Sequence, residues 1–146
     1  MSDAQVLVIN AGSSSIKTAL FDTDLRETLR VEAAGIGTQG SIRASSGTRH
    51  ALALPDHTAA LAAIFDVLAD NGIRAKNLRA AAHRVVHGGS DLTASARITP
   101  AIRDAISDAV PLAPLHNPHH LSAIDAIATL VPDLPQFATF DTAFHA

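Results

Sequence analysis

The sequence predicts an α/β fold with a mixed sheet and flanking helices, and three observations lead to this prediction. The first is an apolar run, residues 5–10, followed by an alternating segment, residues 15–22, which together indicate two antiparallel strands. The second is a glycine-punctuated stretch, residues 27–54, typical of further strands. The third is a change to helical spacing after Pro55, where helices begin to alternate with strands. Functional residues are therefore expected at strand ends and in the loops that follow them.

Capping signals define the later elements. The predicted helices cover residues 56–73, 99–110 and 117–131, and the later strands cover residues 79–89 and 135–141. Thr99 and Asn117 are expected to cap helices, because each precedes a proline at the first helical position. An Asn-Gly pair, residues 71–72, is a stop signal for the first helix. The chain therefore reads as one α/β unit without internal repeats.

Composition argues against several classes of protein. The 146 residues are 47% apolar and 17% charged, with a net charge of −3 and no basic run. Neither nucleic acid nor an anionic membrane is therefore an expected partner. Cysteine is absent, which excludes disulfides and thiolate metal sites and suits the cytoplasm. We expect neither a membrane span, which needs about 18 apolar residues in a row, nor a signal peptide.

The connection between the first two strands has the composition of an anion-binding loop. Residues 11–15 are Ala-Gly-Ser-Ser-Ser, which leave backbone N–H groups accessible to a phosphate and add hydroxyl donors. Lys17, on the following strand, supplies a charge suited to phosphate. The same residues also fit an ordinary tight hairpin whose lysine extends into solvent. The GxxxxGK[ST] pattern is absent and no helix follows, so a phosphate would be bound by a hairpin.

Three further segments carry candidate functional residues. In the first, residues 83–89, Arg84 lies within an apolar strand, where a guanidinium needs a partner. That partner is either a planar anion held by two hydrogen bonds or a structural ion pair with a residue such as Asp141. In the second, residues 111–120, a rigid proline-rich turn leads into a helix. The third, Phe-Asp-Thr-Ala-Phe-His, places Asp141 at the end of a strand.

The eight histidines raise the possibility of a metal site. Five of them lie in two of these segments: His83, His87, His116, His119 and His120. His119 and His120 are adjacent at a helix start and so cannot both face one ion, and no HExxH or other chelating spacing occurs. A metal hydrolase built on these histidines is therefore the least favoured interpretation.

Together the four segments resemble the acetate kinase family, the short-chain carboxylate kinases also called acetokinases. The segments are VLVINAGSSSIKTALFD, HRVVHGG, PLAPLHNP and FDTAFH, and they occur in that family's order and at its approximate spacing. The resemblance extends over essentially the whole chain. It implies an actin-like, ribonuclease-H-like fold of the acetate and sugar kinase superfamily. It also implies reversible phosphoryl transfer from ATP to acetate, giving ADP and acetyl phosphate, with Mg²⁺ as cofactor.

The resemblance implies roles for residues on the ATP side of the site. Asn10 matches the asparagine associated with the magnesium site. Ser13, Ser15 and Lys17 match residues that face the ATP phosphates. The resemblance thus implies that the serine-rich connection is a phosphate-binding loop.

On the acetate side, Arg84 matches the arginine that binds the carboxylate and the phosphoryl group in transit. Val86 and Leu115 match the small apolar pocket around the acyl methyl group. Asp141 matches the catalytic aspartate. A base is not needed in the forward direction, because a carboxylic acid with a pKa of about 4 is already ionised at pH 7. Asp141 is therefore expected to orient Arg84 or a water bound to magnesium, and proton donation by Asp141 in some step stays open.

The sequence departs from the family next to the His-Asn-Pro turn. His116 and Asn117 match this turn, which lies near the active site. His119 and His120 follow where small or polar residues are usual. Both are expected at a helix start, facing solvent, and the alternative is that they affect the pocket.

The resemblance covers only the first part of a family member. It implies that residues 1–146 are the N-terminal lobe, and that the second, adenosine-binding lobe, through which such enzymes form homodimers, is absent from this chain. Acetate kinase is the favoured function. Propionate or butyrate kinase stays open, because one methylene in an apolar pocket is worth only about 1–3 kcal/mol. A truncated, non-catalytic phosphate-binding lobe is the other alternative.

Overall fold

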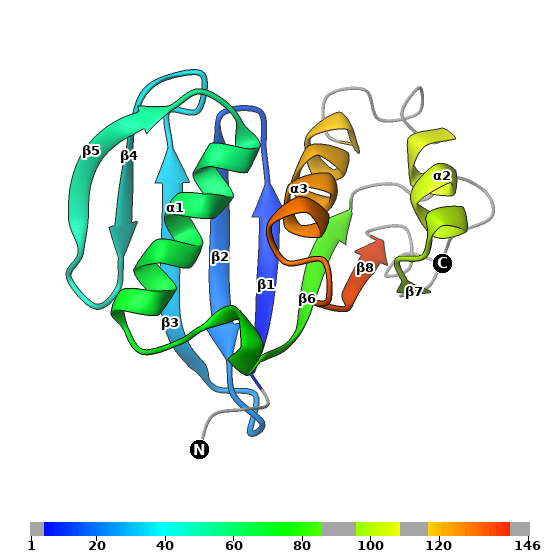
Figure 1. Ribbon diagram of the computed structural model, residues 1–146, viewed down its shortest axis with the longest axis horizontal. Coiled ribbons are helices and arrows are strands. Elements are labelled where there is room, and N and C mark those ends of the chain that lie inside the picture. The colour runs from blue at the N-terminus through cyan, green and yellow to red at the C-terminus, as the bar shows by residue number, and fades with distance from the viewer. Residues whose placement is uncertain (1–4, 86–95, 109–116, 141–146) are drawn as a thin grey trace.

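The computed structural model describes residues 5–85, 96–108 and 117–140, which form a mixed sheet with helices packed on one face (Figure 1). The described residues contribute eight strands to this sheet, in the order β5-β4-β3-β2-β1-β6-β8-β7. The strands are β1 Gln5–Ala11, β2 Ser15–Phe21, β3 Glu27–Ala34, β4 Thr38–Ala44, β5 Arg49–Leu54, β6 Leu78–Val85, β7 Ala96–Arg97 and β8 Gln136–Phe140. The helices are α1 His57–Asp70, α2 Pro100–Asp108 and α3 Asn117–Leu130, with a short 3-10 helix at Ala75–Asn77.

The first five strands form an antiparallel meander, and two later strands extend it in parallel. Each of β2 to β5 pairs with the strand before it. β6 then pairs with β1 in parallel, and β8 pairs with β6 in parallel. The C-terminal ends of β1, β6 and β8 therefore lie at one edge of the sheet, beside the β1–β2 connection. Figure 1 shows that α1 and α3 also begin at this edge.

The main core lies between the sheet and the two longer helices. Alternate residues of β1 and β2 point toward the helices, as the period of two in a strand requires. The largest fully buried side chains of this layer are Leu7, Ile9, Ile16, Leu20, Ile42, Leu54, Leu61, Ile64, Leu68 and Ile127. Full burial of each such side chain contributes about 1.5–3 kcal/mol. The opposite face of β1 to β4 carries the polar side chains of the candidate site.

Two of the three predicted helix-end signals, at Thr99 and at Asn71-Gly72, are found in the structure. Asp56 accepts a hydrogen bond from the Ala59 N–H at 2.8 Å and so caps α1. Asn71 ends the helix, and Gly72 follows at a φ of 83°, a left-handed conformation that glycine adopts without strain. Thr99 accepts from the Ile102 N–H at 3.3 Å and caps α2. The Thr99 cap and the Asn71-Gly72 stop are thereby confirmed, whereas Asp56 was not predicted as a cap. Asn117, which was predicted to cap α3, is instead the first residue of that helix.

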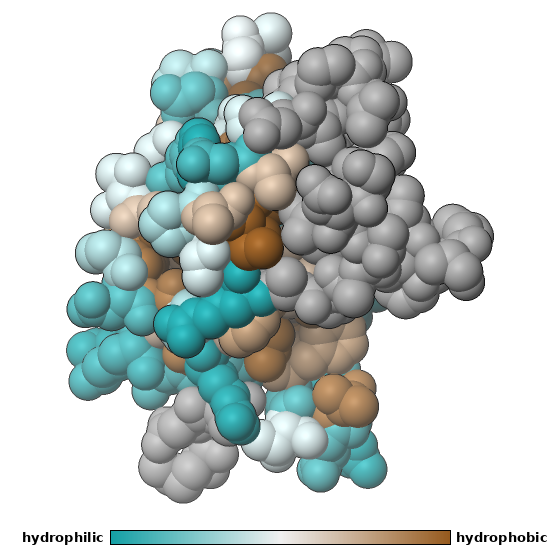
Figure 2. Space-filling view, turned by 90° about the vertical axis from the view of Figure 1, so that its right-hand side faces the viewer, coloured by the Kyte–Doolittle hydropathy of each residue, from teal (hydrophilic) through white to brown (hydrophobic). Residues whose placement is uncertain are grey.

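The part of the chain around α2 has its own small core. Ile106 of α2, Ile124 of α3 and Ala138 of β8 are buried together. Arg103 joins the two helices by donating two hydrogen bonds, each 2.7 Å long, to the carboxylate of Asp125. On this side of the molecule, polar and apolar side chains are interspersed over the described surface (Figure 2). No described helix combines the length and apolar character that a membrane span requires.

Candidate functional site

The β1–β2 connection, residues 12–15 (the serine loop), is a tight hairpin, as predicted. The Gly12 N–H donates to the Ser15 carbonyl at 2.8 Å, which closes the loop. The Ile36 N–H, in the turn between β3 and β4, donates to the Ser14 carbonyl at 2.9 Å. Ser13 is exposed, whereas Ser15 is half-buried. The loop is therefore held by its own hydrogen bond and by one from the β3–β4 turn, while Ser13 is exposed.

Three of the predicted site residues form a row across the sheet face that α1 and α3 leave uncovered. Asn10 of β1 lies opposite Lys17 of β2 in the antiparallel register. On the other side of β1, Ile9 pairs with His83, so Arg84 of β6 lies beside Asn10. All three side chains are exposed. Because neighbouring strands are about 4.8 Å apart, the backbones at Lys17 and Arg84 are separated by about 10 Å.

Arg84 differs from its prediction in one respect. The sequence places it within an apolar strand, which suggested a buried guanidinium that needs a partner. In the structure it is the exposed neighbour of the buried His83, because successive strand residues point to opposite faces. The guanidinium is thus accessible to a ligand from the face that also carries Asn10.

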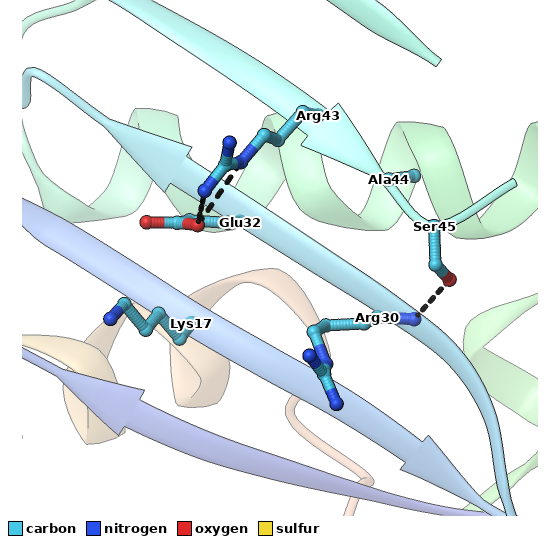
Figure 3. A pocket seen from close by; sticks show the side chains of 6 residues that line it. All are labelled: Lys17, Arg30, Glu32, Arg43, Ala44 and Ser45. Atoms are coloured by element: carbon cyan, nitrogen blue, oxygen red, sulfur yellow. Dashed lines mark hydrogen bonds and ion pairs between the residues drawn. The ribbon is translucent and has the colours of Figure 1, made fainter. Parts of the chain in front are cut away.

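The polar row continues from Lys17 onto β3 and β4. Lys17 pairs in register with Glu32, and Glu32 pairs with Arg43. Arg43 donates from Nη2 to the Glu32 carboxylate at 2.8 Å and from Nε at 3.2 Å (Figure 3). Because Arg43 occupies this carboxylate, no ion pair of the described residues neutralises Lys17.

Lys17 borders a shallow hollow of about 430 Å³ on this face (Figure 3). The residues around it are Lys17, Arg30, Glu32, Arg43, Ala44 and Ser45. Arg43 is paired with Glu32, and Arg30 is paired with Glu27 at 2.9 Å. Lys17 therefore leaves an excess positive charge at the hollow, which favours anions. Sequence reasoning missed Arg30 and Arg43, because the alternation that puts them on one face with Lys17 depends on the register of three strands.

A buried polar pair lies behind Arg84. His83 is 1% exposed, and its Nε2 lies 2.6 Å from Oε1 of Gln136 on the neighbouring β8. Gln136 uses its amide nitrogen to donate to the Ile124 carbonyl of α3 at 3.1 Å. The amide oxygen must therefore accept from His83, which fixes the Nε2–H tautomer of the imidazole. The pair joins β6, β8 and α3 immediately below the exposed row.

Burial keeps His83 neutral. Desolvation lowers the pKa of His83 to about 4, although the hydrogen bond to Gln136 acts in the opposite direction and the nearby His120 lowers it further. In the unfolded chain the same imidazole has a pKa of 6.5. Between these two values the unfolded chain binds a proton that the folded chain excludes.

We expect acid to destabilise the fold through His83. The exclusion of a proton from His83 contributes up to about 3 kcal/mol to the free energy of unfolding. This contribution is fully present above pH 6.5 and is lost as the pH falls toward 4. Urea unfolding of the chain at several pH values measures this slope. The His83→Gln variant, which cannot titrate, should show a flatter profile between pH 6.5 and 5. Parallel profiles for the two proteins would contradict the assignment.

The adjacent histidines at the start of α3 do not face solvent, and that prediction is wrong. His120 is 3% exposed and lies close enough to His83 to lower its pKa. His119 is half-buried, and its ring stacks on that of His57 with centroids 5.7 Å apart. α3 begins only two residues earlier, so its first turn already packs against α1 and the sheet.

Several predicted site residues fall outside the described part of the chain. They are Val86, Leu115, His116 and Asp141. Asn117 is the first residue of α3. β8, which was predicted to lead into Asp141, ends at Phe140 beside β6. The methyl pocket and the catalytic aspartate therefore stay predictions.

The described residues account for only a small part of the ligands that a magnesium site needs. Mg²⁺ prefers oxygen ligands and keeps several waters and substrate phosphates in its shell. The exposed amide of Asn10 offers one such oxygen next to Lys17. Within residues 5–85, 96–108 and 117–140, no group of three or more His, Asp or Glu side chains is placed to hold a metal.

Known proteins are similar to this chain in both sequence and fold. The sequence profile of the acetokinase family matches residues 5–146. The acetate kinase of Streptomyces avermitilis is 42% identical over 156 residues, which cover 99% of this chain and 38% of that protein. The acetate kinase of Clostridioides difficile is 38% identical over 152 residues, which cover 97% of this chain and 38% of that protein.

Solved structures agree. The acetate kinase of Porphyromonas gingivalis superposes with a TM-score of 0.88 at 34% identity, and a propionate kinase from Francisella tularensis with 0.89 at 34%. Each match covers 97% of this chain and 38% of the other. The predicted fold class is thereby confirmed, and the chain spans about two fifths of the length of the relatives it matches. Because the family profile extends over nearly all of its residues, the chain belongs to the acetokinase family.

Proposed function

We propose that this chain is the N-terminal lobe of an enzyme that transfers a phosphoryl group between ATP and acetate. The observation that carries the proposal is the row of Lys17, Asn10 and Arg84 on three adjacent strands. The row combines two cations with an amide oxygen beside the serine loop. A phosphoryl group transferred there would have positive charge on both sides.

The forward reaction needs positioning more than covalent chemistry. A carboxylate oxygen of acetate attacks the γ-phosphorus, a P–O bond forms, and the bond to the bridging oxygen of ADP breaks. No proton has to be removed, because acetate is ionised at pH 7. The planar guanidinium of Arg84 holds the carboxylate and then the equatorial phosphoryl oxygens, while Lys17 and the serine loop hold the phosphates of ATP. Asp141 would orient Arg84 from the end of β8.

Mg²⁺ is the proposed cofactor, with Asn10 as one ligand, directly or through water. When bound, the ion neutralises charge on the ATP phosphates as the bond to the leaving group breaks. Carboxylate ligands would have to come from elsewhere in a complete enzyme. This part of the proposal rests on the family and on the position of Asn10 beside Lys17.

Acetate is the proposed substrate, because the similar proteins of Streptomyces avermitilis and Clostridioides difficile are acetate kinases. Propionate is the closest alternative, since one structural match is a propionate kinase. Val86 and Leu115 would decide between them, although one methylene changes transition-state binding by only about 1–3 kcal/mol. Adenosine binding, homodimer formation and the cytoplasmic location belong to the proposal for the complete enzyme.

The test joins residues 1–146 to the segment that follows the matching region in the Streptomyces avermitilis acetate kinase. We expect this joined protein to make acetyl phosphate from ATP and acetate, trapped as the hydroxamate. Lys17→Met should lower its kcat/KM for ATP by about a hundredfold, because an uncompensated charge near the phosphates is removed. A folded joined protein without turnover would reject the proposal and favour a non-catalytic phosphate-binding lobe.

A further inference from the structure

A histidine that the sequence does not single out contacts the serine loop. His57 is the first residue of α1, is half-buried, and places its Nε2 2.8 Å from the carbonyl oxygen of Gly12. A carbonyl oxygen can only accept, so Nε2 carries the hydrogen and the imidazole donates. The contact joins the start of a helix to a loop 45 residues earlier in the chain.

The orientation of the His57 ring is fixed by a second ring. His119, near the start of α3, stacks on His57 with an interplanar angle of 12° and centroids 5.7 Å apart. α1 and α3 both begin at the edge of the sheet where the serine loop lies (Figure 1). The donor therefore has a defined direction toward the Gly12 carbonyl. His119 also gains a role in this way, at a position where the acetokinase pattern leads one to expect a small or polar residue.

The hydrogen bond determines where the next N–H points. The peptide unit between Gly12 and Ser13 is planar and trans, so its C=O and N–H point in opposite directions. With the Gly12 oxygen held toward α1 by His57, the Ser13 N–H is directed away from α1. The Ser15 and Ser14 carbonyls are held as well, by the N–H groups of Gly12 and Ile36. Rotation of the 12–13 peptide plane is the freedom that His57 removes.

We propose that His57 is a positioning residue for the serine loop: it holds the Gly12 carbonyl so that the Ser13 N–H donates to a phosphoryl oxygen of a bound polyphosphate chain. This inference rests on the proposed function, because the ligand is the polyphosphate of a nucleotide. A backbone donor that is already oriented binds an anion without the entropy cost of ordering the loop. His119 acts through His57 by holding its ring.

Three variants separate this role from a merely structural one. His57→Phe keeps a flat ring for His119 to stack on but has no donor. His57→Gln has an amide nitrogen as many bonds from Cα as Nε2, so it can still donate to Gly12. Lys17→Met removes a proposed phosphate contact without touching His57. Each is compared with the unaltered 146-residue chain by titrating inorganic tripolyphosphate into ¹⁵N-labelled protein and following the Ser13 amide by NMR.

The unaltered chain should show a saturable shift of Ser13, and the His57 Nε2–H should shift along the same curve. His57→Phe should weaken binding by about fivefold to tenfold, the range expected for one oriented hydrogen bond. His57→Gln should stay within about threefold of the unaltered chain. Lys17→Met should weaken binding by at least the same factor as His57→Phe, because it removes a charge.

The outcomes separate the role of His57 from the proposed phosphate binding on which it rests. Weakened binding in Lys17→Met with unchanged binding in His57→Phe would overturn the inference alone. Absence of saturable binding in the unaltered chain, or insensitivity to Lys17→Met, would overturn the proposed phosphate site together with it. If His57→Gln binds tripolyphosphate as weakly as His57→Phe, and both variants unfold at a lower urea concentration than the unaltered chain, His57 has only a structural role. A Ser13 shift with a stationary His57 resonance in the unaltered chain would also contradict the inference, whether or not the variants fold.

Discussion

Replacing Arg84 with leucine in the joined protein should lower kcat/KM for acetate by at least about a thousandfold while the fold stays intact. The guanidinium is the only one of the predicted acetate-side groups that the described residues place on the face with Asn10 and Lys17. Its two parallel donors would hold the carboxylate in the ground state and the phosphoryl oxygens in the transition state, so both binding and turnover depend on it. Hydroxamate trapping of acetyl phosphate measures the loss.

Two further variants serve as controls for the effect of Arg84→Leu. Arg79 lies on the same strand, is also exposed, and is five residues away from Arg84, so Arg79→Leu should leave activity within about twofold. Arg84→Lys keeps the charge but loses the two parallel N–H donors of the guanidinium. Its kcat/KM should therefore lie between those of Arg84→Leu and the unaltered joined protein. Activity of Arg84→Leu within a few-fold of the joined protein would reject the assignment. So would global unfolding of that variant, because an exposed residue should not support the core.

The 146-residue chain alone should make no detectable acetyl phosphate, although it folds. The row and the serine loop lie on an open face, where water screens the charges of Lys17 and Arg84. A complete site excludes that water when a second lobe closes over the substrates. Positioning ATP against acetate is also lost, and this effect can be worth about 7–11 kcal/mol at its limit. The continuous core under α1 and α3 explains why folding should survive.

The measurement compares the isolated chain with the joined protein at equal concentration by the same hydroxamate assay. Circular dichroism and a cooperative urea transition serve as the folding control for the short chain. Comparable specific activities would contradict the prediction and would mean that residues 1–146 already contain a complete site. An inactive chain that still binds tripolyphosphate would be the expected combination.

Much of the fold could be predicted from local patterns. The strand alternation in residues 15–21, the cap at Thr99 and the Asn-Gly stop after α1 each act within a few residues, so they are readable in the sequence. β7 has two residues and the 3-10 helix has three, too short for any periodic pattern. Both depend on packing against neighbours that lie far away in the sequence.

The candidate site was predictable in its residues but not in its surroundings. Motif positions identify Lys17 and Arg84, and strand parity then places them on one face. The burial of His120 and the contact of His57 with Gly12 depend on where α1 and α3 meet the sheet. No local pattern encodes that meeting point, so the histidines at the start of α3 were expected in solvent. Their environment follows from tertiary packing of two helices, not from their neighbours in sequence.

The strand order also determines how this sheet behaves toward a second copy of itself. An edge strand presents unpaired N–H and C=O groups on which another chain can add a strand. Among the described strands, the edges are β5 and β7. β5 exposes Arg49 and His50 and is followed by Pro55, and β7 is only two residues long. Charge at one edge and shortness at the other make both poor templates, so the described sheet is protected against the edge-to-edge growth that leads to β-aggregation.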